Sequence, residues 1–524
     1  MVKSSLFKKL QSTPLYPLLF AAYPALALLQ SNIDKVGLSM LWRPLLGSVV
    51  LGGLVFWVVW LFLRQAHKAA LLTTLWLALF FSYGHVYMAV EKEYPGATYT
   101  RWLTAVWVVL FSLALVWVVF SRFRFASSTL ALNVAALALL IMAGWRITPD
   151  VHAHSVHALA VEDAPIQTDL VLPEKPPDVY YFLLDSYGRS DLLEQAYHFD
   201  NSEFLAGLEQ RGFFVAGCSQ SNYVRTELSM ASALNMQYLQ ALSDKWTPDT
   251  TARRLLWNSI KHSAVRYNFE NLGYETVTAD TGFDWLNIPD SDHFLSPLPV
   301  TSSQVSQFET LLLQTTFARY VENWGWLDPD ALKGAGSRDR FRTVFNNIDD
   351  IARMPQPTFA YLHLISPHPP FVFDPSGKPT YPPDFWNENR QYPWDLYEKG
   401  YVNQLPFLNK NILQAIDTIM AESDVPPVII VQSDHGPWLQ SNNKRMWNLT
   451  AIYFPGHKDR LYAGLSPVNI FRLVFNTYFG GKYDMLKDVS YFSPVPQIYD
   501  FSRVSNSCGN NRLETRPPKK ALDP

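Results

Sequence analysis

Charge is scarce in this chain, and neither sign dominates the little that is present. Charged residues make up 17% of the 524 positions, and the formal net charge at pH 7 is -3. Proteins that bind nucleic acid carry a basic patch or stripe, and a nearly balanced composition gives no electrostatic case for one. We therefore expect no nucleic-acid partner.

The scarcity of charge is greatest in residues 1–146, where long apolar runs take its place. Crossing a hydrocarbon core takes ~20 apolar residues. No clear small-residue cleavage site follows the first run, and four more runs come after it, which argues against a cleaved signal peptide. We predict a helical membrane domain of about five spans, near residues 14–30, 45–63, 69–88, 102–120 and 126–145.

Basic residues in the loops predict the orientation of these spans. One set of loops holds seven: Lys3, Lys8, Lys9, Arg64, Lys68, Arg122 and Arg124. The opposite set holds four: Lys35, Arg43, Lys92 and Arg101. Because basic loops stay in the cytoplasm, the bias favours a cytoplasmic N-terminus. Five crossings would then leave everything after residue 146 on the outer side of the plasma (inner) membrane.

The remainder of the chain divides by composition into three parts. Residues 147–176 are proline-bearing and aperiodic, as in a linker. Residues 177–505 have the mixed charge of a folded domain, and 506–524 form a polar tail. Strand-like segments alternate with helical patterns, which predicts an α/β domain with a mostly parallel sheet between helices. The expected strands are 178–184, 274–278, 358–364, 427–433 and 449–454.

The chain has only two cysteines, Cys218 and Cys508, and both lie in the part expected outside the cytoplasm. An oxidising compartment permits a disulfide between them. Two free buried thiols are the alternative, because sequence cannot show whether the two Cα atoms approach each other.

Acidic groups follow two of the predicted strands. The run Val428 to Gln432 is β-branched and apolar, and Ser433, Asp434, His435 and Gly436 follow it. The strand 178–184 is followed by Asp185. Ligands of open α/β sheets bind outside the carboxyl ends of the strands. The two strand ends therefore predict one metal site assembled by the fold, although a turn-capping Asp434 with a packed His435 is the simpler interpretation.

Two further segments carry candidate chemistry. Thr226 precedes a helical pattern, where its hydroxyl would either cap the helix or act as a nucleophile. His368 is held between Pro367 and Pro369 after a strand, a rigid position suited to phosphate binding, proton donation or metal ligation. His363, inside that strand, is interpreted as a packed core histidine.

The order of these motifs resembles the sulfatase-like branch of the alkaline phosphatase superfamily. With the apolar N-terminus, the chain is similar to membrane-anchored members such as lipoteichoic acid synthases and phosphoethanolamine transferases. The resemblance covers about residues 177–500. It implies one divalent metal ion, manganese, zinc or magnesium, bound by Asp185, Thr226, Asp434 and His435. Thr226 would be the nucleophile and His368 the histidine on the substrate side.

The chain also departs from parts of that superfamily. Cys218 is followed by Ser219, Gln220, Ser221 and Asn222 and not by the Cys/Ser-x-Pro-x-Arg pattern that sulfatases mature into formylglycine. No full second ligand set for a two-zinc site is evident. These differences favour threonine chemistry with one metal.

The resemblance implies an extracytoplasmic transferase that moves a phospho-group from a lipid-linked phosphodiester to an envelope glycan or lipid. Arg445 and His368 would hold the anionic substrate. A hydrolase of sulfate or phosphate esters would use the same residues with water as acceptor. A degenerate assembly protein without activity is a third hypothesis. A transporter is a fourth, although the spans have few charges at their centres, with His85 as an exception.

Overall fold

The computed structural model describes residues 12–506 and Cys508, except for 33–37, 95–99, 123–124, 157–164, 244–245, 249–252, 298–305, 324–328, 381–393, 440–443, 496 and 507. The contacts divide the chain into two compact units. The first comprises 1–156 with 305–329, and the second comprises 157–304 with 330–524. The predicted boundaries at 146 and 176 stay predictions, and the predicted tail 506–524 lies outside the described residues apart from Asn506 and Cys508.

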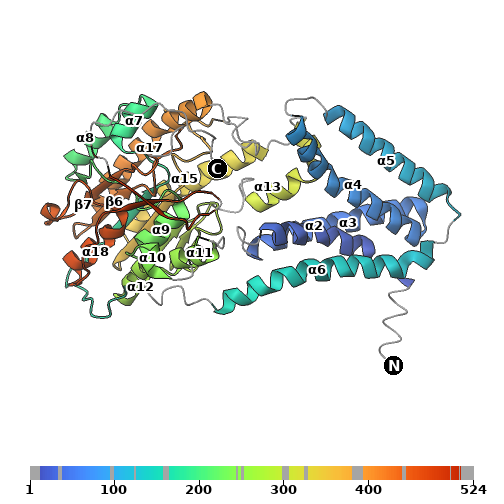
Figure 1. Ribbon diagram of the computed structural model, residues 1–524, viewed down its shortest axis with the longest axis horizontal. Helices are drawn as coiled ribbons and strands as arrows, with labels where there is room; N and C mark the ends of the chain where they lie inside the picture. The colour runs from blue at the N-terminus through green and yellow to red at the C-terminus, as the bar shows by residue number, and fades with distance from the viewer. Residues whose placement is uncertain are drawn as a thin grey trace. The chain divides into compact units, whose positions relative to one another are not determined.

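The first unit, which we call the membrane unit, is helical (Figure 1). Three of its described helices are long and apolar enough to cross a membrane: α3, residues 66–91 of α4, and α5. The chain is therefore a membrane protein, and the count of five spans stays a prediction. The elements are α2 (Tyr16–Asn32), η1 (Leu38–Leu41), α3 (Trp42–Leu63), α4 (Ala66–Glu93), α5 (Thr100–Phe120), η2 (Phe125–Ser128), α6 (Thr129–Val156), α13 (Gln307–Gln314) and α14 (Ala318–Asn323).

Helices α13 and α14 come from far along the chain but pack within the membrane unit. A capping box of Ser306 and Glu309 starts α13. The backbone N–H of Gly84 in α4 donates to the carbonyl of Thr315 at 3.1 Å, and that of Phe317 donates to the carbonyl of Phe80 at 2.7 Å. The local sequence of this segment carries no sign of this partner.

The second unit, which we call the catalytic unit, is built on one seven-stranded sheet in the order β2-β7-β6-β1-β5-β3-β4. Only β7 runs antiparallel to its neighbours, so the predicted mostly parallel sheet is confirmed. The five predicted strands appear as β1, β3, β5, β6 and β7. The strands are β1 (Val179–Leu184), β2 (Phe214–Val215), β3 (Glu275–Ala279), β4 (His293–Leu295), β5 (Thr358–Leu364), β6 (Val428–Gln432) and β7 (Thr450–Tyr453), with a separate pair β8 (Ser490–Phe492) and β9 (Ser502–Val504).

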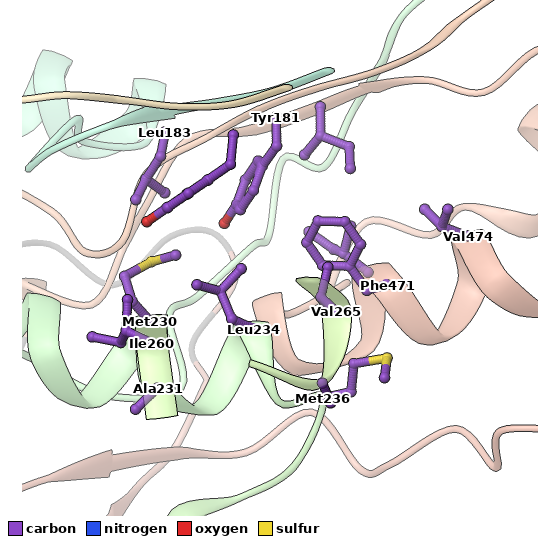
Figure 2. Packing of buried hydrophobic residues seen from close by; sticks show 14 of the residues in the cluster. Tyr181, Leu183, Met230, Ala231, Leu234, Met236, Ile260, Val265, Phe471 and Val474 are labelled. Carbon is purple, nitrogen blue, oxygen red and sulfur yellow. The ribbon is translucent and has the colours of Figure 1, made fainter. Parts of the chain in front are cut away.

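Helices cover both faces of this sheet (Figure 1). Alternate residues of β1 enter two different cores, Tyr181 and Leu183 on one side and Phe182 and Leu184 on the other. Figure 2 shows Tyr181 and Leu183 facing side chains of α9, α12 and α18. The helices are α7 (Ser190–Tyr197), α8 (Ser202–Gln210), α9 (Thr226–Leu234), α10 (Leu239–Leu242), α11 (Arg254–Lys261), α12 (Ala264–Asn271), α15 (Pro329–Asn346), α16 (Ile348–Ala352), α17 (Trp394–Glu422), η4 (Lys458–Arg460) and α18 (Pro467–Tyr478).

The two cysteines form a disulfide in the catalytic unit. The Cα atoms of Cys218 and Cys508 are 5.2 Å apart, within the usual range for a bridge. The Asn506 side chain also donates to the carbonyl of Cys218 at 3.1 Å. The bridge therefore joins the end of the chain to the loop that leads into α9.

Candidate metal centre and nucleophile

Asp185, Asp434 and His435 meet at the carboxyl edge of the sheet. Strands β1 and β6 are parallel neighbours with Leu183 beside Gln432, so the residues that follow them lie together. One ligand atom from each of the three lies within 4.8 Å of the other two, and all three side chains are buried. The fold thus assembles the predicted strand-end acids, while the metal itself stays a prediction.

A glycine is required where this loop turns. A Cβ on Gly436 would come within 2.7 Å of the carbonyl oxygen of Trp447 and 2.9 Å of that of Arg445. Real Cβ atoms do not approach backbone that closely, because the two would overlap. The Gly436 N–H also donates to the Arg445 carbonyl at 2.5 Å, which holds the segment after His435 against the segment that carries Arg445.

The hydrogen bonds of His435 leave one ring nitrogen available. Its Nδ1 lies 2.8 Å from the Gly436 carbonyl, which can only accept, so Nδ1 carries the proton. Its Nε2 then carries a lone pair, which can accept a hydrogen bond or bind a metal. Burial lowers the pKa of His435, and the charge of Arg445 adds to this against the opposing carboxylates. The ring is neutral at pH 7.

Asp434 has one satisfied oxygen and one buried oxygen without a hydrogen bond. Oδ1 accepts from the Ser186 N–H at 2.9 Å. Oδ2 has no hydrogen-bond partner in the described residues, although it is 3.3 Å from His435 Nε2. A buried carboxylate oxygen without a donor is costly, and a cation between Asp434, Asp185 and His435 would remove that cost. The donor set of two carboxylates and one neutral imidazole therefore fits a divalent metal ion.

Thr226 is the first residue of α9, and its hydroxyl does not cap that helix. The N-cap residue is Arg225, and no side-chain cap hydrogen bond is present. Thr226 Oγ1 instead lies 3.3 Å from His435 Nε2. Because Nε2 has no proton, the threonine hydroxyl donates. A second contact ties α9 to the same loop, since Ser229 Oγ donates to the Asp434 carbonyl at 2.7 Å. The capping interpretation of Thr226 is therefore wrong.

His368 lies on a loop that is attached to the end of β1. Its backbone N–H donates to the Asp185 carbonyl at 3.1 Å. Its Nδ1 donates to the Pro369 carbonyl at 2.7 Å, so Nε2 is the atom left for other partners. The structure thus brings His368 to the predicted centre, where its role stays a prediction.

His363 is a residue that sequence analysis did not place at the site. It is buried in β5, beside Leu183 of β1, and its Nε2 lies 3.5 Å from Asp185 Oδ2 without any hydrogen-bond partner. Burial alone would raise the pKa of Asp185, but the imidazoles of His368, His363 and His435 hold it well below its usual range. The signal was present in the sequence, because His363 and Asp185 both lie at the ends of strands that proved to be neighbours.

Residues 177–471 match the sequence profile of the family described as sulfatase. No curated protein matches the chain. Among solved structures it is similar to the integral membrane lipooligosaccharide phosphoethanolamine transferase A from Neisseria meningitidis, with 14% identity, a TM-score of 0.38 and coverage of 89% of this chain and 96% of that one.

Two other solved structures show a similar degree of likeness. The lipoteichoic acid synthase from Listeria monocytogenes has 13% identity and a TM-score of 0.35, over 66% of this chain and 81% of that one. The phosphonate monoester hydrolase of Agrobacterium radiobacter has 14% identity and a TM-score of 0.35, over 60% and 80%. The family assignment rests on the profile match instead. Since that match spans more than half of the chain, the protein belongs to the sulfatase family of enzymes.

Proposed function

We propose that this protein is an extracytoplasmic, metal-dependent transferase that moves a phospho-group from a membrane lipid to an acceptor in the cell envelope. One observation carries the proposal: the Thr226 hydroxyl lies 3.3 Å from His435 Nε2, beside the buried set Asp185, Asp434 and His435. A nucleophile needs a neighbouring group that activates it and a site that stabilises the charge that develops.

Asp185, Asp434, His435 and the Thr226 hydroxyl would hold one divalent cation, for which manganese, zinc and magnesium are the candidates. When bound, such a cation lowers the pKa of a coordinated hydroxyl and stabilises negative charge on phosphoryl oxygens. The hydrogen bond from His435 Nδ1 to Gly436 keeps the ring in the tautomer and orientation that this role requires.

The remaining steps belong to side chains of this protein. Thr226 Oγ1 releases its proton to water and attacks the phosphorus of the donor, and the bond from phosphorus to the lipid alcohol oxygen breaks. His368 Nε2 gives a proton to the departing oxygen, since its Nδ1 is committed to Pro369. Arg445 and His368 hold the anionic group. An acceptor hydroxyl of a glycan or lipid then attacks the phosphorus and gives its proton to His368 Nε2. The bond from phosphorus to Thr226 Oγ1 breaks, and Oγ1 takes a proton from water to restore the hydroxyl.

Attachment to the bilayer suits a lipid donor. Linking a site to the surface on which its substrate lies turns encounter into a local event and raises the effective concentration. An ester hydrolase of the same family would use the same residues with water as the acceptor. The two activities differ in their product, since a hydrolase accumulates the free headgroup whereas a transferase accumulates a modified acceptor.

We further propose that the chain crosses the membrane five times, with a cytoplasmic N-terminus. Packing within the membrane unit supports counting α2 as a span. Near its start, the N–H groups of Leu15 and Tyr16 donate to the side-chain oxygen of Asn133 in α6, and near its end Leu29 shares a cluster with Ile147. Helix α2 therefore lies along α6 in the same direction, and if α6 spans the bilayer, α2 crosses it too.

Reporter fusions in the full chain test this topology. A reporter that is active only when exported should work after Pro524 and fail in the loop at 64–68. A tag before residue 12 should be inaccessible from outside the cell. An accessible N-terminal tag would reduce the spans to four, and a cytoplasmic C-terminus would refute the envelope assignment.

Thr226→Ala in the full-length protein tests the chemistry. We expect a loss of at least about a thousandfold in turnover of a chromogenic phosphodiester and of a lipid donor, with unchanged thermal stability. Thr226→Ser is the matched control, because it keeps a hydroxyl and should keep part of the activity. Near-normal turnover in Thr226→Ala would remove Thr226 from the mechanism and leave the non-catalytic hypothesis standing.

A further inference from the structure

One segment of the chain leaves the catalytic unit, packs in the membrane unit and then returns. After β4 the chain forms α13 and α14, and α15 leads back into the catalytic unit. Contacts assign 305–329 to the membrane unit, although 157–304 before it and 330–524 after it belong to the catalytic unit. The chain therefore joins the two units in two places, once after α6 and once through this inserted segment, which the structure describes at 306–323.

The backbone of the inserted segment pairs with the backbone of α4. The C=O of Phe80 and the N–H of Gly84 are four residues apart, as acceptor and donor are in an α-helix. Here the Phe80 carbonyl accepts from the Phe317 N–H at 2.7 Å, and the Gly84 N–H donates to the Thr315 carbonyl at 3.1 Å. Backbone groups away from water need such partners, so the segment is held by more than contact between side chains.

The apolar side chains of α13 are buried against several membrane helices. Helix α13 packs beside α2 (Figure 1). Phe308 and Leu312 of α13 are 2% and 7% exposed, and they share one cluster with Leu29 of α2, Leu41 of η1 and Ile147 of α6. Because these partners come from three separate elements, α13 bridges them. Close packing of this kind is a main source of attraction between helices in a membrane, where lipid surrounds them.

The inserted segment lies toward one end of each helix that it contacts. Leu29 is near the end of α2, Leu41 comes just before α3, and Ile147 is in the second half of α6. On α4, Arg319 of the segment forms an ion pair with Glu91 at 3.1 Å, near the end of that helix. Since α6 leads into the catalytic unit, these ends face the side of the membrane on which the catalytic unit lies. The same four ends share one side in the proposed five-span topology.

We propose that residues 306–323 are a second attachment, through which the catalytic unit is anchored to the membrane helices independently of the chain after α6. The inference goes beyond the proposed function and does not depend on it. The first attachment enters the catalytic unit beside the end of α18, where the Val171 N–H donates to the Phe479 carbonyl at 2.9 Å. The second leaves from β4, at the edge of the sheet. Attachment at two different elements limits how far the catalytic unit can turn or move away more than one flexible connection would.

Cutting the first attachment in the full-length protein tests the second. A specific protease site is placed within 157–164, and a tag before residue 12 captures the membrane unit in mild detergent. After complete cleavage, we expect at least about tenfold more of the fragment 165–524 in the captured fraction than in the flow-through. A fragment that is found in the flow-through would overturn the proposal. The readout is location and not activity, so failure of the transferase proposal leaves this test unaffected.

Cutting all three connections is the control for the source of the retention. Further protease sites within 298–305 and 324–328 separate the inserted segment from the catalytic unit. The two pieces of the catalytic unit should stay together, because β1 pairs with β5 and β6 across the cut, and both should move to the flow-through. If the pieces are still captured after the three cuts, another surface holds the catalytic unit and the proposal is overturned.

A matched pair of glycine variants tests the contact itself in the protein cut only within 157–164. A Cβ at Gly84 would meet the backbone of Gln314 and Thr315, whereas a Cβ at Gly144 has nothing within 4 Å. Gly84→Val should lower the captured fraction of the fragment at least about fivefold, and Gly144→Val should leave it as in the wild type. Leu312→Ser, which alters the segment and not the membrane helices, should also lower capture. Wild-type capture in both Gly84→Val and Leu312→Ser would overturn the attachment.

Discussion

The membrane unit and the catalytic unit use large apolar side chains in opposite ways. In the membrane unit, Phe62, Trp102 and Phe120 are 83%, 78% and 78% exposed. In the catalytic unit, Tyr181 and Phe182 lie between the sheet and its helices and are 1% and 0% exposed. Outward apolar side chains are stable where hydrocarbon surrounds them. The exposed apolar surface of the membrane unit is therefore stable only in contact with lipid, whereas the catalytic unit is stabilised by burying its apolar side chains in its own core.

The units also differ in how they treat charge. In the membrane unit, two ion pairs lie near helix ends, Arg319 with Glu91 at 3.1 Å and Arg43 with Glu309 at 3.1 Å, although Arg319 Nε is itself buried without a hydrogen bond. The catalytic unit keeps Asp434 Oδ2 and the Nε atoms of Arg225 and Arg445 buried without hydrogen bonds. Folds tolerate such costs mainly where function requires them.

Among changes of charge or packing within one unit, the largest effect should come from removing one charge at the candidate metal centre. Asp434→Asn keeps the oxygen that accepts the Ser186 N–H but loses the carboxylate needed by the cation. We expect metal content to fall and activity to drop at least about a hundredfold. Elemental analysis of the purified full-length protein, with a diester assay, measures both. Asp417→Asn, at a surface ion pair, is the control, and full metal occupancy in Asp434→Asn would sink the ligand assignment.

An effect of intermediate size, on stability, should follow from adding a methyl group at Gly84 in the membrane unit. Gly84 lies against the backbone of Gln314 and Thr315, and a Cβ there would fall well inside van der Waals contact. Although alanine favours helix, Gly84→Ala should lower the free energy of unfolding by about 1–3 kcal/mol and make 306–323 more accessible to protease. Thermal denaturation and limited proteolysis in detergent measure these changes. Gly144→Ala, with nothing within 4 Å of the added atom, is the control, and equal stability of both variants would contradict the packing.

The smallest effect should be a gain in stability at the opposite edge of the sheet. Burial raises the pKa of Asp178 from 3.8 to about 6, against a hydrogen bond from the Thr358 N–H that lowers it. A raised pKa means that the stabilising contribution is complete below pH 3.8 and is lost as the pH rises through about 6. Above that pH, the folded state holds a half-buried charge.

Asp178→Asn removes this charge and keeps an oxygen for Thr358. At pH 8 we expect the variant to be more stable than the wild type by about 1–2 kcal/mol, and below the unfolded-state pKa of 3.8 to differ little. Thermal denaturation at the two values checks the sign. A variant that is less stable at pH 8 would show that the carboxylate is stabilised there by groups beyond Thr358.

Much of the architecture could be predicted from local patterns. The strands at β1, β5 and β6 are short apolar runs that end in polar residues, and a parallel sheet places those ends at one edge. Asp185, Asp434 and His435 were therefore expected to meet. Thr226 could not be assigned from its local sequence, because a cap and a nucleophile occupy the same position at the start of a helix.

The amino-acid sequence by itself determined the apolar segments, the alternation of strands and helices, and the two acidic strand ends, because run length and periodicity are local properties. Only the tertiary structure decided that His363 lies 3.5 Å from Asp185, that Thr226 Oγ1 lies 3.3 Å from His435 Nε2, and that 306–323 packs in the membrane unit. Each of these joins segments far apart in the chain. Which distant segments meet depends on strand order and helix packing, and no local pattern encodes either.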